Sequence, residues 1–234
     1  MTAVMARLQR LLDHQKRFVR DAAHQLRTPL AVLKTQVQSA RRGDAPAPQA
    51  LAEIGATVER ATVLANQMLS LAKVEQLRQR PEFERIDLAE AVRDVALDLS
   101  PLLADKSLDF ALEVQPTPVR AHRWMLQELT RNLLHNAIRL SPPGAALLVQ
   151  VRPDAGQALL QVVDGGPGIS AELRQRLFTP FAAGDVARGS GLGLAICREI
   201  VQALDGEIGL DNRLAADGKV LGLAAVVRLP QASE

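Results

Sequence analysis

Apolar residues in the first part of the chain recur with the seven-residue repeat of helices that pack side by side. A polar residue and a proline, Gln15 and Pro29, interrupt the resulting stripe. The pattern predicts one long helix that ends near Ala40 and is kinked at Pro29, where a backbone donor is missing. The stripe consists of Met5, Leu8, Leu12, Val19, Ala22, Leu26 and Leu33.

A second stripe with the same spacing follows a predicted loop at 41–46, in which Gly43 is expected to stop the first helix. Two antiparallel helices with one apolar stripe each make half of a four-helix bundle. We therefore expect a homodimer, because pairing two hairpins buries both stripes. The second stripe consists of Leu51, Ile54, Val58, Ala61, Ala65, Met68 and Ala72.

The pattern changes after the charged, proline-containing stretch at 76–82, which we interpret as an interdomain linker. Asp87 is expected to cap a helix that runs to about Ala104. Because helices and strands then interleave without regular parallel crossover units, we predict an α+β chain whose second part is a two-layer α/β sandwich. Further helices are expected at 122–140 and 192–204, and strands at 108–114, 147–151, 158–163, 208–210 and 221–229.

Composition excludes several classes of protein. Hydrophobic residues make up 47% of the 234 positions and aromatic residues only 3%, so the core is expected to be aliphatic. The net charge of +2, without a basic run that contains aromatics, does not indicate nucleic acid. A single cysteine, Cys197, excludes a disulfide framework, and the four histidines lack metal-ligand spacing. No apolar run approaches the ~20 residues that span a bilayer.

One histidine lies where a packing residue would not. Within the seven-residue repeat, His24 falls opposite the apolar stripe, so we expect its imidazole to face solvent. Neutral imidazole is a good nucleophile near neutral pH. Residues 18–30 resemble the H-box of two-component sensor histidine kinases. The matching residues are Phe18, Asp21, His24, Leu26, Arg27, Thr28, Pro29 and Leu30.

The H-box resemblance implies roles for three residues. His24 would accept the phosphoryl group, and Thr28 would position water for dephosphorylation of the partner regulator. Gln25 departs from the pattern, because most members have an acid there. Its amide can orient the imidazole ring but adds no negative charge.

Two asparagines share one face of the helix expected at 122–140, because Asn132 and Asn136 are four residues apart. With their surroundings they resemble the N-box of the kinase ATP-binding domain. The resemblance implies that Asn136 is the principal Mg²⁺ ligand, that Asn132 assists and that Arg139 contacts phosphate oxygens. Three residues depart from the usual pattern. His122 and His135 are interpreted as surface substitutions, and Leu140 replaces an aromatic residue that stacks near adenine.

A first glycine-rich segment, 162–169, follows a predicted strand. Alone it could be an ordinary tight turn. It resembles the first glycine box of the same kinases, which implies that Asp164 accepts a hydrogen bond from the adenine amino group. Gly166 and Gly168 would let the base lie against the chain.

A second glycine-rich segment, 189–196, opens a predicted helix, so its free N–H groups can face phosphates. It resembles the second glycine box. The preceding Phe178 and Phe181 resemble the F-box and would anchor a lid at 182–188. The residues that the second box contributes to nucleotide binding are Gly189, Gly191, Leu192 and Gly193.

Together the five boxes cover roughly residues 10–230 in the order found in sensor histidine kinases. The resemblance implies a Bergerat-type ATP-binding fold, ATP and Mg²⁺ as cofactors, autophosphorylation on His24 and phosphotransfer to an aspartate in the receiver domain of a response regulator. The expected domains are an exit helix of a signal-relay module (1–17), a dimerisation and phosphotransfer domain (18–78), a linker (79–86), the ATP-binding domain (87–230) and a tail (231–234). We expect the cytoplasmic portion of a bacterial inner-membrane sensor, whose membrane contact belongs to an absent N-terminal part.

Two other functions remain open at this point. The related ATPases of the chaperone, gyrase and mismatch-repair type carry a glutamate four residues before the magnesium asparagine, to activate water. Asn132 occupies that position here, so hydrolysis is not expected to be the main reaction. The second alternative is a scaffold that binds nucleotide without catalysis, which Gln25 and Leu140 leave open.

Overall fold

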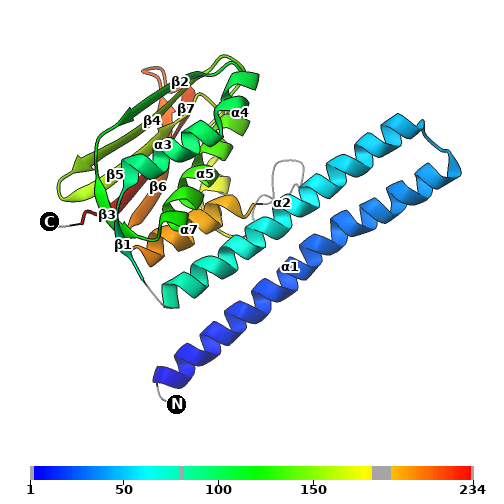
Figure 1. Ribbon diagram of the computed structural model, residues 1–234, viewed down its shortest axis with the longest axis horizontal. Coiled ribbons are helices and arrows are strands. Elements are labelled where there is room, and N and C mark those ends of the chain that lie inside the picture. The colour runs from blue at the N-terminus through cyan, green and yellow to red at the C-terminus, as the bar shows by residue number, and fades with distance from the viewer. Residues whose placement is uncertain (1–2, 80–81, 181–190, 233–234) are drawn as a thin grey trace. The chain divides into compact units, whose positions relative to one another are not determined.

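The computed structural model describes residues 3–79, 82–180 and 191–232. The chain divides into two compact units, residues 1–69 and 70–234 (Figure 1). The first contains two long antiparallel helices, α1 (Ala3–Arg42) and most of α2 (Ala47–Gln79). The first helix continues through Pro29 to Arg42.

The turn between the two helices forms for local reasons. Gly43 adopts a left-handed φ of +76°, and its N–H donates to the carbonyl of Ala40. The N–H of Asp44 reaches back to the carbonyl of Ser39, which completes a helix-terminating pattern. The Asp44 carboxylate also accepts hydrogen bonds from the side chains of Ser39 and Arg42, each 3.0 Å long.

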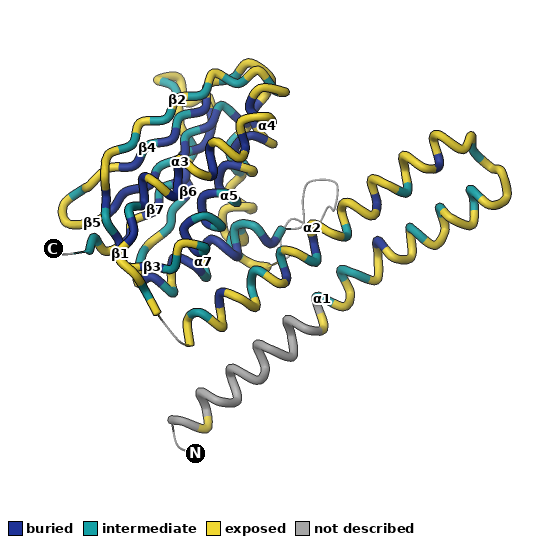
Figure 2. Tube along the Cα trace, viewed as in Figure 1, coloured by how far each residue is buried: buried dark blue, intermediate teal, exposed yellow. Residues whose placement is uncertain are grey.

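The hairpin buries only part of its apolar surface. On α2, Leu64 and Met68 are buried, whereas other members and neighbours of the predicted stripe are exposed (Figure 2). The predicted single stripe is therefore covered only in part, and several of its residues stay exposed. Large apolar residues exposed on the hairpin are Leu30, Val32, Val37, Leu51, Val58, Val63 and Leu69.

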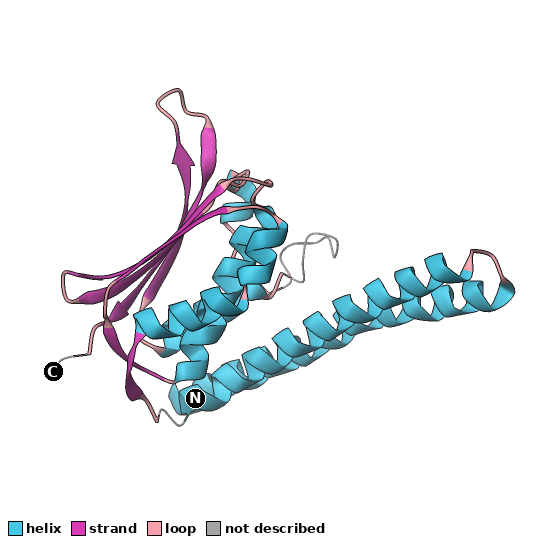
Figure 3. Cartoon of the chain, turned by 45° about the horizontal axis from the view of Figure 1, so that its top comes forward, coloured by secondary structure: helices cyan, strands magenta, loops and turns pink. Residues whose placement is uncertain are grey.

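The second unit is a two-layer α/β sandwich, as the sequence predicts, with helices on one face of a mixed sheet (Figure 3). The sheet has the strand order β2-β4-β5-β7-β6, in which β2 and β4 are parallel and the other neighbours antiparallel. The strands are β2 (Asp109–Val114), β4 (Ala146–Asp154), β5 (Gln157–Val163), β6 (Glu207–Leu214) and β7 (Val220–Pro230).

The helical layer contains α3 (Leu88–Asp98), α5 (Arg123–Leu140) and α7 (Gly193–Ala203), with the short α4 (Ser100–Asp105) and α6 (Ala171–Arg174). The core is aliphatic, as the composition predicts, and includes the fully buried Leu129, Leu160 and Ile200.

Two expectations for this unit were incomplete. The helix predicted from Asp87 to Ala104 is two helices, because Leu99 leaves the helical conformation and Pro101 opens α4. The structure also contains a small antiparallel ladder that the sequence pattern did not indicate, formed by β1 (Glu84–Asp87) and β3 (Pro118–Ala121). Both strands have only four residues, which is too short to show an alternating pattern.

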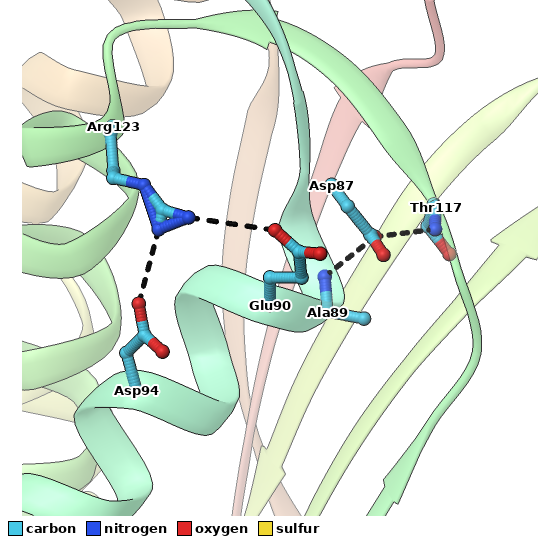
Figure 4. A network of polar contacts seen from close by, with 6 residues as sticks. All are labelled: Asp87, Ala89, Glu90, Asp94, Thr117 and Arg123. Atoms are coloured by element: carbon cyan, nitrogen blue, oxygen red, sulfur yellow. Dashed lines mark hydrogen bonds and ion pairs between the residues drawn. The ribbon is translucent and has the colours of Figure 1, made fainter.

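Asp87 caps α3 as predicted and has a second role (Figure 4). Its Oδ1 accepts from the N–H of Ala89 at 3.0 Å and from the N–H of Thr117 at 2.8 Å, so it also holds the chain before β3. Nearby, Arg123 at the start of α5 forms ion pairs with Glu90 and Asp94 of α3, at 3.5 Å and 3.1 Å. These contacts connect α3 to α5, the helix that carries the candidate site.

Candidate active site

The start of α5 corrects the interpretation of His122 as a surface substitution. His122 is half-buried, and its Nδ1 accepts a hydrogen bond of 3.2 Å from the N–H of Trp124. The histidine therefore serves as the N-cap of α5, the role that a short acidic side chain would otherwise fill. A deprotonated Nδ1 can accept this bond, which is why an imidazole can replace a carboxylate here.

The two asparagines of α5 lie where the sequence predicts, half-buried on one side of the helix. The Asn132 amide donates to the carbonyl of Glu128 at 2.8 Å and to its Oε1 at 3.1 Å. These bonds use Nδ2, so Asn132 presents its oxygen to the neighbouring α7. A Cβ atom at Gly193 would lie 3.0 Å from Asn132 Oδ1 and 3.7 Å from Asn136 Nδ2. The structure thus brings the N-box and the second glycine segment together.

The start of α7 offers free backbone donors beside these amides. Gly191 has a φ of +69°, and Leu192 is fully buried. The first intrahelical bond runs from the N–H of Ile196 to the carbonyl of Leu192. The N–H groups of residues 193–195 therefore have no intrahelical acceptor, the usual condition for anion binding at a helix start. Gly189, Phe181 and the lid predicted at 182–188 lie outside the described residues, and Phe178 is half-buried.

Asp164 follows β5 and is buried, with 5% of its surface exposed. Its Oδ1 accepts from the N–H of Gly166 at 2.8 Å and from the N–H of Leu223 at 3.1 Å. Burial raises the pKa of the Asp164 carboxyl, and the two backbone hydrogen bonds oppose that rise in part. Because both bonds use Oδ1, an N–H donor on a ligand would meet Oδ2.

The first glycine segment is closely packed at both predicted positions. A Cβ atom at Gly166 would lie 3.0 Å from Asp164 Oδ1 and 3.2 Å from the carbonyl oxygen of Leu140. Gly168 has a φ of +72°, and a Cβ atom there would lie 2.6 Å from Asn212 Oδ1. This Asn212 on β6 is a site residue that the sequence analysis missed, because no motif points to an asparagine in an edge strand.

The exposed side of α5 is basic. Arg139 and His135 are one turn apart, with Arg131 one turn further back. Burial, and then the charges of Arg131 and Arg139, lowers the pKa of His135, so this imidazole is neutral at neutral pH. Partial burial also lowers the pKa of Arg139, but a guanidinium remains charged. His135 lies at the surface, as expected, and its imidazole ring is shielded from water only in part.

The donor set suits a phosphate-bound cation better than a protein-only metal site. Within 3–79, 82–180 and 191–232 no group of three or more His, Cys, Asp or Glu side chains could hold a metal ion. The two asparagines instead offer amide groups beside the free N–H groups of α7. Mg²⁺ prefers oxygen ligands and commonly combines a few protein ligands with substrate phosphates.

The three H-box residues lie in the other unit, on α1. His24 is exposed, as predicted, and Gln25 is half-buried. Thr28 is exposed, and its hydroxyl makes a long contact of 3.5 Å with the carbonyl of His24, one turn earlier. The structure thus places the hydroxyl and the imidazole on the same stretch of helix surface.

Two family models match the chain. Residues 122–233 match the histidine kinase-, DNA gyrase B- and HSP90-like ATPase domain, and residues 14–77 match the His kinase A phospho-acceptor domain. The chain is 35% identical over 236 residues to the sensor protein kinase PmrB of Pseudomonas aeruginosa. The aligned region covers 99% of this chain and 49% of that protein.

Solved structures agree with these matches. The histidine kinase AdeS of Acinetobacter baumannii has a TM-score of 0.72 at 26% identity and covers 90% of this chain and 98% of that one. The histidine kinase ThkA, solved in complex with the response regulator protein TrrA, has a TM-score of 0.68 and covers 96% of this chain and 64% of that one. At 20% identity, the ThkA match shows the fold alone.

These matches define a protein with a phospho-acceptor helical hairpin and a histidine kinase-type ATPase domain. The chain belongs to the two-component sensor histidine kinases. It spans about half the length of the curated relatives it matches. Among the described residues, no helix is long and apolar enough to cross a lipid bilayer.

Proposed function

We propose that this chain binds ATP with Mg²⁺, phosphorylates itself on His24 and passes the phosphoryl group to an aspartate of a response regulator. The observation that carries the proposal is the proximity of Asn132, Asn136 and the glycine at the start of α7. It combines cation-binding amides with backbone donors for phosphate, in a domain of the matching family. An exposed imidazole on the other unit supplies the acceptor.

In the nucleotide site, Asp164 Oδ2 accepts from the adenine amino group, while Gly166 and Gly168 allow the base to approach the backbone. Asn136 ligates Mg²⁺ and Asn132 assists. Gly191, Leu192 and Gly193 position N–H groups for phosphate oxygens, and Gly189 belongs to the same segment of the sequence. Arg139 adds positive charge near the phosphates.

In the transfer step, Nε2 of His24 attacks the γ-phosphorus of ATP. An N–P bond forms, the bond from phosphorus to the bridging oxygen breaks, and ADP leaves. Gln25 orients the ring, and the amide carries no charge to stabilise the imidazolium that develops. Catalysis is therefore mainly positioning and charge neutralisation, as is general for phosphoryl transfer.

We further propose that two hairpins pair into a four-helix bundle. The uncovered apolar residues of α1 and α2 support this, because a stripe of that length is rarely left in water. Gln36 supports it too, because its Oε1 is buried without a hydrogen-bond partner among the described residues. It lines a hollow of about 430 Å³ between the helices, which also includes Thr35 and Glu53. A second copy could fill this hollow and pair the amide.

The proposed partner of the phosphorylated hairpin is the receiver domain of a response regulator. The similar fold of ThkA was solved with the response regulator TrrA, which supports this class of partner. Thr28 would then position water for the reverse dephosphorylation. We place the whole protein in a bacterial inner membrane, with this chain on the cytoplasmic side. Sensing belongs to a part of the protein other than this chain. The domain bounds proposed from the sequence, 18–78 and 87–230, remain part of this proposal.

The main alternative function is ATP hydrolysis by an ATPase of the gyrase or chaperone type, and the geometry around Asn132 argues against it. Such enzymes need a carboxylate four residues before the magnesium asparagine, and that residue is Asn132. The nearest carboxylate along the helix, Glu128, is one turn further away and is hydrogen-bonded to Asn132. This geometry favours phosphoryl transfer to an external acceptor over activation of water.

The test is incubation of the chain with γ-labelled ATP and Mg²⁺, followed by treatment of the labelled protein with acid and with base. A phosphoramidate on histidine is labile in acid and stable in base. Asn136→Ala should prevent labelling by removing the cation ligand. Acid-stable label, or release of phosphate without any labelled protein, would contradict the proposal.

A further inference from the structure

The C-terminal end of α5 is held by one lysine from a distant part of the sequence. Lys106, just after α4, places its Nζ 2.8 Å from each of three carbonyl oxygens, those of Ile138, Arg139 and Ser141. An ammonium group has three N–H donors, so all three are used. The next carbonyl back, that of Ala137, accepts from the N–H and the hydroxyl of Ser141. Most of the carbonyl groups in the last turn of α5 therefore have a hydrogen-bond donor.

Lys106 is itself held in place. Its carbonyl accepts a hydrogen bond of 3.1 Å from the N–H of Gly144, in the loop that leaves α5. The side chain is therefore anchored at both ends to the same segment, and little conformational freedom is lost when its three bonds form. Its positive charge also lies at the negative end of the α5 dipole, where a cation is favourable.

This end of α5 contacts the proposed adenine site. The carbonyl oxygen of Leu140 lies 3.2 Å from the position of a Cβ atom at Gly166, in the first glycine segment. Arg139, the proposed phosphate contact, has its backbone carbonyl bonded to Lys106. Any displacement of the last turn of α5 would therefore move Arg139 and alter the space around Gly166 at the same time.

We propose that Lys106 is a positioning residue for nucleotide binding. Its ammonium fixes the last turn of α5, so that Arg139 faces the phosphates and Leu140 borders the base. The inference rests on the proposed nucleotide site. Lys106 touches no part of the nucleotide in this account, and its effect passes through the three carbonyls alone.

The primary variant is Lys106→Ala, studied in the whole 234-residue chain. Loss of a charge-assisted set of bonds should raise the dissociation constant for ATP-Mg and the KM for ATP by about tenfold. The kcat for autophosphorylation should change by less than about threefold, because His24, the asparagines and the Arg139 side chain itself are all still present in the variant. Lys106→Arg should recover only part of the affinity, since a planar guanidinium does not match three converging carbonyls.

Chemical rescue separates positioning by a cation from general loss of structure. Lys106→Ala leaves three carbonyl oxygens around a space the size of an ammonium group, so added methylammonium should restore ATP affinity in this variant. A tetramethylammonium salt at the same ionic strength should not restore ATP affinity, because tetramethylammonium has no N–H donor. Lys219→Ala, in the exposed turn before β7, is the matched control and should bind ATP like the parent.

Two outcomes would overturn the inference. One is an unchanged ATP affinity for Lys106→Ala while Asn136→Ala loses binding, which would leave the proposed site intact and remove Lys106 from it. The other is a tenfold loss that methylammonium does not reverse, in protein whose circular dichroism and melting temperature match the parent. If Asn136→Ala also binds ATP-Mg normally, the proposed nucleotide site itself fails.

Discussion

Asn212 holds Ile169 by two hydrogen bonds of 2.8 Å, one in each direction. The amide oxygen accepts from the N–H of Ile169, and the amide nitrogen donates to its carbonyl. An edge strand thus binds the first glycine segment as a further strand would. The same amide oxygen lies 2.6 Å from the position of a Cβ at Gly168, so the close approach depends on glycine.

Replacing Asn212 by alanine should therefore loosen the adenine side of the site. Two partly buried neutral hydrogen bonds contribute about 1 kcal/mol each, so ATP affinity should fall by up to roughly thirtyfold. Asn212→Asp keeps the accepting oxygen and loses the donor, and its affinity should lie between those of the parent and the alanine variant. Titration calorimetry with ATP-Mg measures this, and equal affinity for all three proteins would contradict it.

Gly193→Ala tests the contact between α5 and α7. The added methyl would lie 3.0 Å from Asn132 Oδ1, so that amide must move and the cation site is disturbed. We expect weaker Mg²⁺-dependent ATP binding with little loss of stability, because alanine favours a helix over glycine. Gly209→Ala is the matched control, since nothing lies within 4 Å of its added methyl. Similar ATP affinity for both variants would show that the amides tolerate the displacement.

Asp164 predicts an effect of pH on nucleotide binding. Its pKa is raised in the folded protein, mainly by burial, so folding disfavours the ionised form at pH values above its ordinary pKa. As pH falls through the raised pKa, protonation removes the acceptor for the adenine amino group and ATP affinity should decrease. Asp164→Asn should bind ATP weakly at neutral pH without a lower melting temperature. A substantial fall in melting temperature would contradict this account.

The cap on α5 predicts a difference between two substitutions of His122. His122→Ala removes the acceptor for the N–H of Trp124 and should lower the free energy of unfolding by about 1 kcal/mol. His122→Asp restores a short acceptor and should be at least as stable as the parent. Denaturant unfolding at neutral pH provides the comparison. If the alanine variant is as stable as the parent, the histidine does not cap the helix.

The sequence predicted the fold where its pattern repeats over several turns. The long hairpin and the helices that became α5 and α7 follow from spacing of apolar residues, and the sheet strands follow from short β-rich runs. It could not predict the ladder of β1 and β3, whose four-residue strands carry no period. It also predicted a single helix where Leu99 and Pro101 separate α3 from α4. The break was missed because the spacing of apolar residues does not change there.

The candidate site shows a similar division. Motif residues such as Asn132 and Gly193 could be found from the sequence, because their spacing is local. Lys106 and Asn212 could not, because each acts on backbone more than 30 residues away in the chain, and a bond to a backbone group leaves no trace in the partner's residue type. His122 was misjudged for a related reason, because its capping bond depends on where α5 begins.

Labelling of a His24→Ala variant tests the central claim most directly. The imidazole lies in the first unit and the nucleotide residues lie in the second, so the variant should bind ATP-Mg like the parent and take up no label from γ-labelled ATP. Gln38→Ala, an exposed position two repeats further along α1, is the matched control and should label normally. Label that persists on His24→Ala at the parent's rate would contradict the assignment of His24 as the phosphoacceptor.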